Sequence, residues 1–170
     1  GQFSSRHSSE RKYTKAHVPP VWNARLFIRE LFDVSLVHEG MDFPPAPLTS
    51  LSDEALIDRL KRLSAIERRA TALTLAHLIE FDNRRLYADL GLPSLFAYCV
   101  RELGYSEGAA YKRIQAARGA RDYPAVLSML TVGQTSLAAM VILAPHLTPE
   151  NHAEVLSMAG GRSSREVEFM

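Results

Sequence analysis

The segment 95-LFAYCVRELGYSEGAAYKRIQAARGAR-121 predicts two helices joined by a tight turn. Ser94, just before it, can cap the first helix, because a serine hydroxyl accepts a hydrogen bond from a free N–H of the first turn. Gly104 stands where that helix must end, since glycine adopts the left-handed conformation of many helix C-termini with little strain. Ser106 can cap the second helix, and Glu107 suits its positive N-terminal end.

The spacing of residues around Gly104 is that of a helix-turn-helix unit. Leu103, Tyr105, Ala110 and Ile114 fall at positions where such units bury side chains, so we expect these side chains to be buried. The residues then left on the outward face are Ser106, Glu107, Gly108, Tyr111 and Lys112.

We therefore predict that this unit binds double-stranded DNA. Its second helix would enter the major groove, with Tyr111 and Lys112 facing bases and arginines nearer the phosphates. Val100 is bulkier than the small residue usual beneath such a turn, and Arg113 stands where an apolar residue is more common. An ordinary helical hairpin with a solvated basic face therefore stays open as the alternative. The candidate DNA-contacting residues are Ser106, Glu107, Tyr111, Lys112, Arg113, Arg118 and Arg121.

The composition of the 170 residues limits the classes of function. Lys and Arg number 20 against 19 Asp and Glu, so any affinity for nucleic acid must come from local clustering of charge. The single cysteine, Cys99, excludes a disulfide within one chain and is expected to be a small buried apolar residue. No run is long and apolar enough to span a bilayer, and the first residues lack the apolar core of a signal peptide. We expect a cytoplasmic protein.

A long helix is predicted from Ser52, its N-cap, to about Asp82. A helix of this length needs a partner helix from another chain or several short helices laid against it. We expect a homodimer through residues 52–82, and we expect His77 to be a core histidine. The apolar stripe along this helix consists of Leu56, Leu60, Leu63, Ala70, Leu73, His77 and Phe81, and Ile66 and Leu78 widen it.

The chain divides by composition into residues 1–50 and 51–170. The first part combines a basic tail (1–15), a possible amphipathic helix (21–37) and a proline-rich linker. The second part shows no strand alternation. Short helices are expected at 83–90, from Pro124 to about Gly133, and at 137–143, 150–159 and 165–170. The predicted fold is all-α, with the long N-terminal helix packed on a multi-helix bundle that contains the helix-turn-helix-like hairpin of residues 95–121.

The blocks GLPSLFAYCVRELGYSEGAAYKRIQAAR (91–118) and LAPHLTPENH (143–152) carry a resemblance to a known family. Residues 51–168 resemble the helical N-terminal region of bacterial HNH endonuclease-like proteins, in which such blocks precede a C-terminal nuclease module. The hairpin of residues 95–121, together with residues 133–137 (G-x-x-S-L), is more loosely similar to the helix-turn-helix of chromosome-partition proteins. The resemblance implies a helical region associated with DNA.

The nuclease chemistry of that family requires a ββα-metal unit with a histidine base, an orienting asparagine and a metal-binding histidine. None of the histidines here lies in a predicted strand hairpin followed by a helix. His146, Asn151 and His152 form the nearest cluster, and a loop, a cap and the first turn of a helix explain them adequately. We assign no catalytic residue, metal ligand or cofactor. The predicted function is a DNA-binding helical module, and the alternative is a protein–protein interaction or dimerisation module without direct DNA contact.

Overall fold

The computed structural model describes residues 47–170, and every regular element in that range is helical. This confirms the all-α prediction, whereas the predictions for the tail, the amphipathic segment and most of the linker fall on residues 1–46, outside the described residues. The elements in chain order are η1 (Leu48–Ser50), α3 (Asp53–Asn83), α4 (Leu86–Asp89), α5 (Leu95–Arg101), α6 (Glu107–Asp122), α7 (Ala125–Val132), α8 (Leu137–Leu143), η2 (Ala144–His146), α9 (His152–Ala159) and α10 (Ser164–Glu168).

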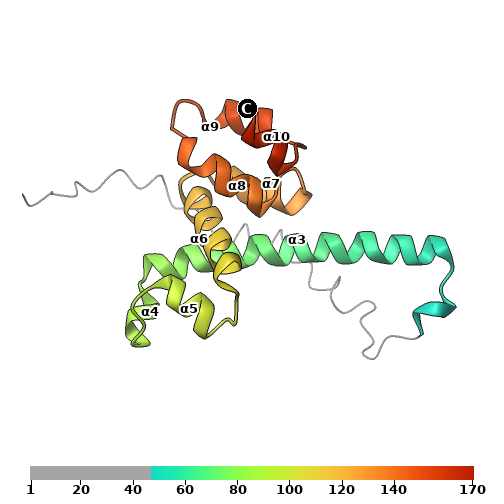
Figure 1. Cartoon of the computed structure of the whole chain (residues 1–170), viewed down its shortest axis with the longest axis horizontal. Helices are drawn as coiled ribbons and strands as arrows, with labels where there is room; N and C mark the ends of the chain where they lie inside the picture. Colours follow the sequence, from blue (N-terminus) through green and yellow to red (C-terminus); the bar gives the residue numbers. More distant parts are fainter. Residues whose placement is uncertain (1–46) are drawn as a thin grey trace, which may run out of the picture.

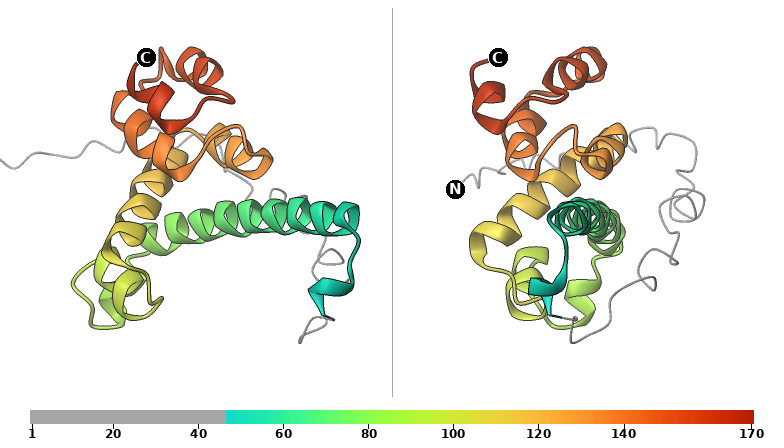
Figure 2. Two further views of the ribbon diagram at one scale, coloured as in Figure 1. Left: turned by 45° about the vertical axis from the view of Figure 1, so that its right-hand side comes forward. Right: turned by 90° about the vertical axis from the view of Figure 1, so that its right-hand side faces the viewer.

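The long helix α3 organises the other elements (Figure 1). α4 and α5 lie on one side of it, α7 to α10 lie on the other, and α6 connects the two groups. The right-hand view of Figure 2 shows α3 end-on, with α6 passing beside it. α3 packs mainly against α6 and α7, and α8 in turn packs against α6 and α10. Although α3 has 31 residues, its charges leave it too polar to cross a membrane, and no other helix within residues 47–170 is long and apolar enough.

Serine hydroxyls set the starts of most of these helices. The hydroxyl of each capping serine accepts a hydrogen bond, at 3.1–3.3 Å, from the backbone N–H three residues later. Such a cap contributes about 1 kcal/mol to stability. The serines are Ser52, Ser94, Ser106, Ser136 and Ser163.

Two predicted helix starts were wrong by a few residues. The helix expected from residue 83 begins at Leu86, because the chain turns at Arg85, whose φ of 53° is left-handed. The helix expected from residue 150 begins at His152. There Thr148 and Asn151 close a turn first: the Thr148 hydroxyl accepts from Asn151 N at 3.3 Å, and Thr148 N donates to the Asn151 amide oxygen at 2.8 Å.

α6 lies at the centre of the core, and the residues on its two buried sides are mostly small. Ala116, Ala117 and Ala120 are almost completely buried, as is Gly119. A Cβ built on Gly119 would lie 3.0 Å from the Cβ of Ala144 in η2. The absence of larger side chains therefore lets α6 approach its neighbours closely on both sides.

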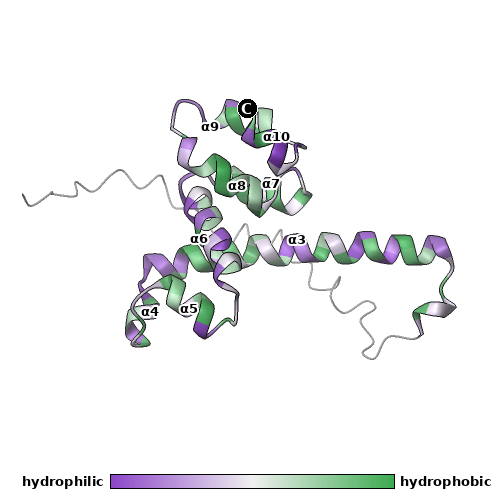
Figure 3. Cartoon of the chain, in the orientation of Figure 1, coloured by the Kyte–Doolittle hydropathy of each residue, from purple (hydrophilic) through white to green (hydrophobic). Residues whose placement is uncertain are grey.

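α3 buries only the C-terminal part of the predicted apolar stripe, where Leu73 and Leu78 are buried. Its buried residues, among them Ala72, Leu75 and Leu78, all lie in its C-terminal half, where α6 and α7 cover it. His77 is exposed, so the expectation of a core histidine was wrong; its Nδ1 lies 2.9 Å from the carbonyl oxygen of Leu73 on the same helix. Figure 3 shows hydrophobic residues along the part of α3 that extends beyond the other helices.

Candidate nucleic-acid interface

The turn between α5 and α6 has the tight geometry that the sequence predicted. Gly104 has a φ of +67°, in the left-handed region, and a Cβ there would contact nothing within 4 Å. The turn is closed by backbone bonds from Leu103 N to Tyr98 O at 3.3 Å and from Tyr105 N to Cys99 O at 3.1 Å. α6 is therefore held at a fixed angle to α5 from its first residue.

The predicted burial around this turn is correct for two of its four residues. Ala110 is fully buried and Ile114 is 5% exposed, but Tyr105 is only half-buried and Leu103 is exposed. Leu103 projects toward α3 and lines an open groove there, while Cys99, one turn earlier in α5, fills the core. The hairpin therefore buries its α6 side more completely than its turn.

The side chains predicted to face outward at the start of α6 are all exposed. They are Ser106, Glu107, Gly108, Tyr111 and Lys112. Arg118 and Arg121 are exposed too. Residues 111 and 118 are seven apart, which is about two helical turns, so Tyr111 and Arg118 lie on one ridge of α6. Lys112 lies to the side of that ridge that faces α3.

Two of the candidate arginines are engaged within the chain. The guanidinium carbon of Arg113 lies 4.4 Å from the centre of the Tyr105 ring, and its NH1 donates to Ala109 O at 3.3 Å. Arg113 is half-buried there, and its cation–π contact braces the turn. The Nε of Arg121 lies 3.4 Å from a carboxylate oxygen of Asp122. Of the candidate cations, Lys112 and Arg118 are the exposed ones without a salt bridge to a described residue.

Lys112 lines a groove of about 450 Å³ between α3, α6 and the turn before α8. Arg68 of α3 lies in the same groove, and its NH1 donates to the Ser64 hydroxyl at 2.9 Å. Its Nε is buried against Gly133, where it has no hydrogen-bond partner, and Arg68 forms no ion pair with any described residue. Glu67 also borders the groove. This groove therefore places two cations and one carboxylate beside the start of α6.

Thr135 is the second unpaired polar group in that groove. It is only 7% exposed, and its hydroxyl has no hydrogen-bond partner among the described residues. Neither Arg68 nor Thr135 was predicted as a site residue. Arg68 lay among other charges on the polar side of the predicted long helix, and nothing in the spacing showed that residues 133–136 would fold against it.

The cluster His146, Asn151 and His152 serves the fold. The Asn151 amide nitrogen donates to His146 O at 3.0 Å, and the His152 ring stacks on Tyr123 with ring centroids 4.7 Å apart. The Nδ1 of His152 lies 2.9 Å from Pro149 O. Within residues 47–170, no group of three or more His, Cys, Asp or Glu side chains is placed to hold a metal ion.

The displaced pKa values lie away from the outward face of α6. Burial raises the pKa of the Cys99 thiol, which favours its neutral form. Hydrogen bonds from Thr148 and Ser163 lower the pKa of Glu150 and Glu166 respectively. Such carboxylates stabilise turns and helix starts, and they lie far along the chain from Tyr111 and Lys112.

The site that the structure offers is thus the exposed first half of α6 together with the groove beside it. Its chemistry is that of a phenol, an ammonium group and guanidinium groups on a rigidly held helix. Comparison with known protein families, curated proteins and solved structures finds no match to this chain.

Proposed function

We propose that residues 51–170 form a DNA-binding helical module that contacts duplex DNA through the first half of α6. The observation that carries this proposal is the exposure of Tyr111 and Lys112 on a helix whose other sides are buried. α6 has 16 residues and would be about 24 Å long. The major groove is about 12 Å wide and admits one α-helix, so the proposal has the exposed first half of α6 lie along it.

The side chains of this face take different roles in the proposal. Tyr111 reaches a base edge or a thymine methyl, because its large side chain is 51% exposed near the helix start. Lys112 and Arg118 flank it and neutralise phosphates. Arg68, across the groove from Lys112, offers its remaining guanidinium donors to the same strand. The resemblance of the middle block to the helical region of HNH endonuclease-like proteins supports a role beside DNA.

The charges of this face set the expected strength of binding. Glu107 and Asp122 flank the ridge at its two ends, so the face is only weakly basic. With Lys112, Arg118 and Arg68 as phosphate contacts, the logarithm of affinity should fall with the logarithm of salt concentration with a slope of about −2.7. Affinity should therefore be modest at physiological salt.

The test is fluorescence anisotropy of labelled duplexes at several salt concentrations. Lys112→Ala and Arg118→Ala should each weaken binding on every sequence and flatten the slope by about one unit. Tyr111→Ala should cost about 1–3 kcal/mol on a preferred site and little elsewhere. Arg165→Ala, which removes an exposed cation from α10, is the control and should leave binding unchanged. Equal affinities for the wild type and all four variants would show that α6 is not the surface that contacts DNA.

A second candidate function, a protein–protein interaction module, is favoured by one separate observation. Leu56, Leu60 and Leu63 of α3 are 36%, 59% and 40% exposed. Consecutive leucines on one uncovered face of a helix usually mark an interface. The two candidate functions use different surfaces, and one chain can carry both.

A further inference from the structure

The uncovered face of α3 has the spacing of a coiled-coil seam. Its positions alternate four and three residues apart over most of the helix, which is the heptad spacing that places side chains against a second helix. None of the residues from 53 to 71 is buried. The positions of this seam are Leu56, Leu60, Leu63, Glu67, Ala70, Thr74, His77 and Phe81.

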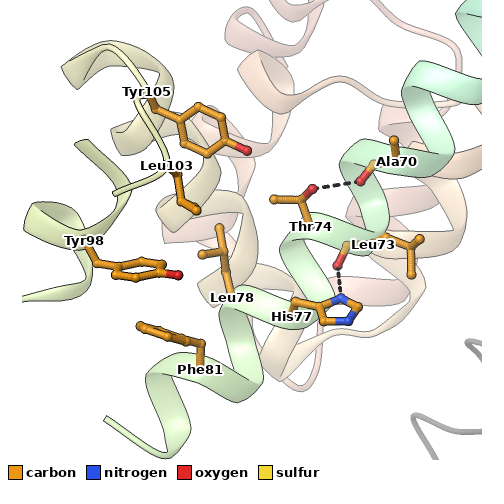
Figure 4. A pocket seen from close by; sticks show the side chains of 9 residues that line it. All are labelled: Ala70, Leu73, Thr74, His77, Leu78, Phe81, Tyr98, Leu103 and Tyr105. Atoms are coloured by element: carbon orange, nitrogen blue, oxygen red, sulfur yellow. Dashed lines mark hydrogen bonds between the residues drawn. The ribbon is translucent and has the colours of Figure 1, made fainter. Parts of the chain in front are cut away.

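The C-terminal half of the seam is the floor of an apolar groove of about 440 Å³ (Figure 4). Tyr98, Leu103 and Tyr105, from α5 and the following turn, form its wall. The two polar side chains of the floor are satisfied by α3 itself: the Thr74 hydroxyl donates to Ala70 O at 2.9 Å, and His77 lies against the Leu73 carbonyl. The groove therefore presents a mainly apolar surface.

The partner that fits this surface is a long, straight helix with exposed leucines. Among the described elements, the helix next in length to α3 is α6, with 16 residues, and α6 is already buried on two sides. α3 itself is such a helix. Its exposed leucines lie in its N-terminal half, on the same seam whose C-terminal half forms the floor of the groove. A second copy of this chain thus supplies both the knobs and the groove, as a two-fold symmetric contact requires.

The charges of α3 select the antiparallel arrangement. The helix begins with Asp53 and Glu54, and Arg84 and Arg85 follow at its end. Antiparallel helices bring the acidic start of one copy beside Arg85 and Arg84 of the other, of which Arg84 also pairs with Glu80 of its own helix at 2.6 Å. Parallel helices would place Asp53 beside Asp53 of the partner subunit, which is repulsive.

We propose that two copies of this chain pair through antiparallel α3 helices, with Leu56 and Leu60 of each copy seated in the groove of the other. When the helices overlap fully, Leu60 lies opposite His77 of the partner subunit, and Leu56 lies opposite Phe81 of the partner subunit. This pairing deepens the interaction-module candidate. It uses a different face from the one proposed for DNA, because no residue of α6 lines the apolar groove, although Glu67 of the seam also borders the groove beside Lys112.

Light scattering coupled to size-exclusion chromatography at tens of micromolar tests the pairing. The wild type should show twice the chain mass of 18.9 kDa. Leu60→Glu, on the seam, and Leu103→Glu, on the groove wall, should each return a single-chain mass. Both side chains are exposed, so both variants should keep the wild-type circular dichroism. Val132→Glu introduces the same charge at a more exposed position of α7 and should remain a dimer.

Three outcomes would overturn the proposal. The first is a single-chain mass for the wild type. If deletion of residues 1–46 then produced a dimer, the seam would be covered by the chain's own first residues, and the proposal would still be wrong for the full chain. The second is a dimer that persists in Leu103→Glu. The third is parallel pairing, tested with a spin label on Ala55→Cys, which keeps Asp53 and Glu54 and is the reactive thiol because Cys99 is fully buried. Antiparallel pairing predicts labels about 40 Å apart from the helical rise, whereas parallel pairing would place them roughly 10 Å apart. Failure of the DNA proposal would leave these masses unchanged, because Lys112→Ala and Arg118→Ala lie off the seam.

Discussion

Gly119→Ala should destabilise the protein, although alanine is the better helix former. In a helix interior, alanine is favoured over glycine by about 0.5–1 kcal/mol. At position 119 the new Cβ would lie 3.0 Å from the Cβ of Ala144, with Met140 Cε at 3.8 Å. Ala144 has no side-chain torsion that could move its methyl group away, so relief requires a shift of α6 against η2. Overpacking of this kind costs about 1–3 kcal/mol. The clash should outweigh the gain in helix propensity, with a net loss of up to about 2.5 kcal/mol.

The matched control for this substitution is Gly108→Ala in the same helix. A Cβ at position 108 would meet nothing within 4 Å, and Gly108 is exposed. Only the helix-propensity term then applies, so Gly108→Ala should raise stability by up to about 1 kcal/mol. The two substitutions are chemically identical and should change stability in opposite directions.

Equilibrium unfolding in urea, followed by circular dichroism, measures both changes as shifts of the midpoint at constant slope. Ala144→Gly removes the other carbon of the contact. In the double variant, the cost of Gly119→Ala should shrink by at least about 0.5 kcal/mol, because residues in contact are energetically coupled. The reasoning is refuted if Gly119→Ala stabilises the protein as Gly108→Ala does, or if the two substitutions at 119 and 144 are additive.

Thr135, in the groove beside Lys112, and Glu166 of α10 give two further predictions. Thr135→Val replaces an unpaired buried hydroxyl by a methyl group of similar shape, so unfolding in urea should show an unchanged or higher stability; a loss above about 1 kcal/mol would mean that the hydroxyl has a partner. Glu166 should titrate below the ordinary glutamate range, because the Ser163 hydroxyl and backbone N–H donate to its carboxylate at 2.7 and 2.8 Å. A lowered folded pKa means that the capping box stabilises α10 above the ordinary glutamate pKa and loses this effect as pH falls through the folded pKa. Carboxyl NMR titration checks this, and Ser163→Ala should raise the pKa of Glu166; an unmoved pKa would exclude the box as its cause.

Local signals in the sequence predicted the helix starts better than the packing. The caps at Ser52, Ser94 and Ser106 follow from the reach of one hydroxyl to the next turn, so neighbouring residues suffice to predict them. The covered face of α3 does not follow from neighbours. Periodicity identified a genuine apolar stripe, but the neighbouring helices bury only Leu73 and Leu78 of it and leave His77 and Leu60 exposed.

The residues of the candidate site also fall into two groups: those that neighbouring residues predict and those that depend on how the helices pack. Exposure of Tyr111 and Lys112 follows from their distance to Gly104 along one helix, and the sequence predicted it correctly. The contribution of Arg68 and Thr135 depends on α3 meeting the turn before α8, which no local pattern encodes. Arg113 was placed near the DNA backbone, but the structure holds it over Tyr105, a ring contact that the sequence analysis did not anticipate.

Because only the C-terminal half of α3 contains buried residues, its two halves should differ in the rate of amide hydrogen exchange. Around Leu75, which is fully buried, amide protons should exchange with solvent only when the whole domain unfolds. The first turns after Asp53 contain no buried residue, and a short stretch of helix without packed neighbours is marginal in water. In a single chain, exchange should therefore accelerate from the middle of α3 toward its start, and pairing of two copies through α3 would slow exchange there. A molecule that binds the N-terminal half of α3 would slow amide exchange there first. The change of exchange rate along α3 therefore reports binding without a label attached to the protein.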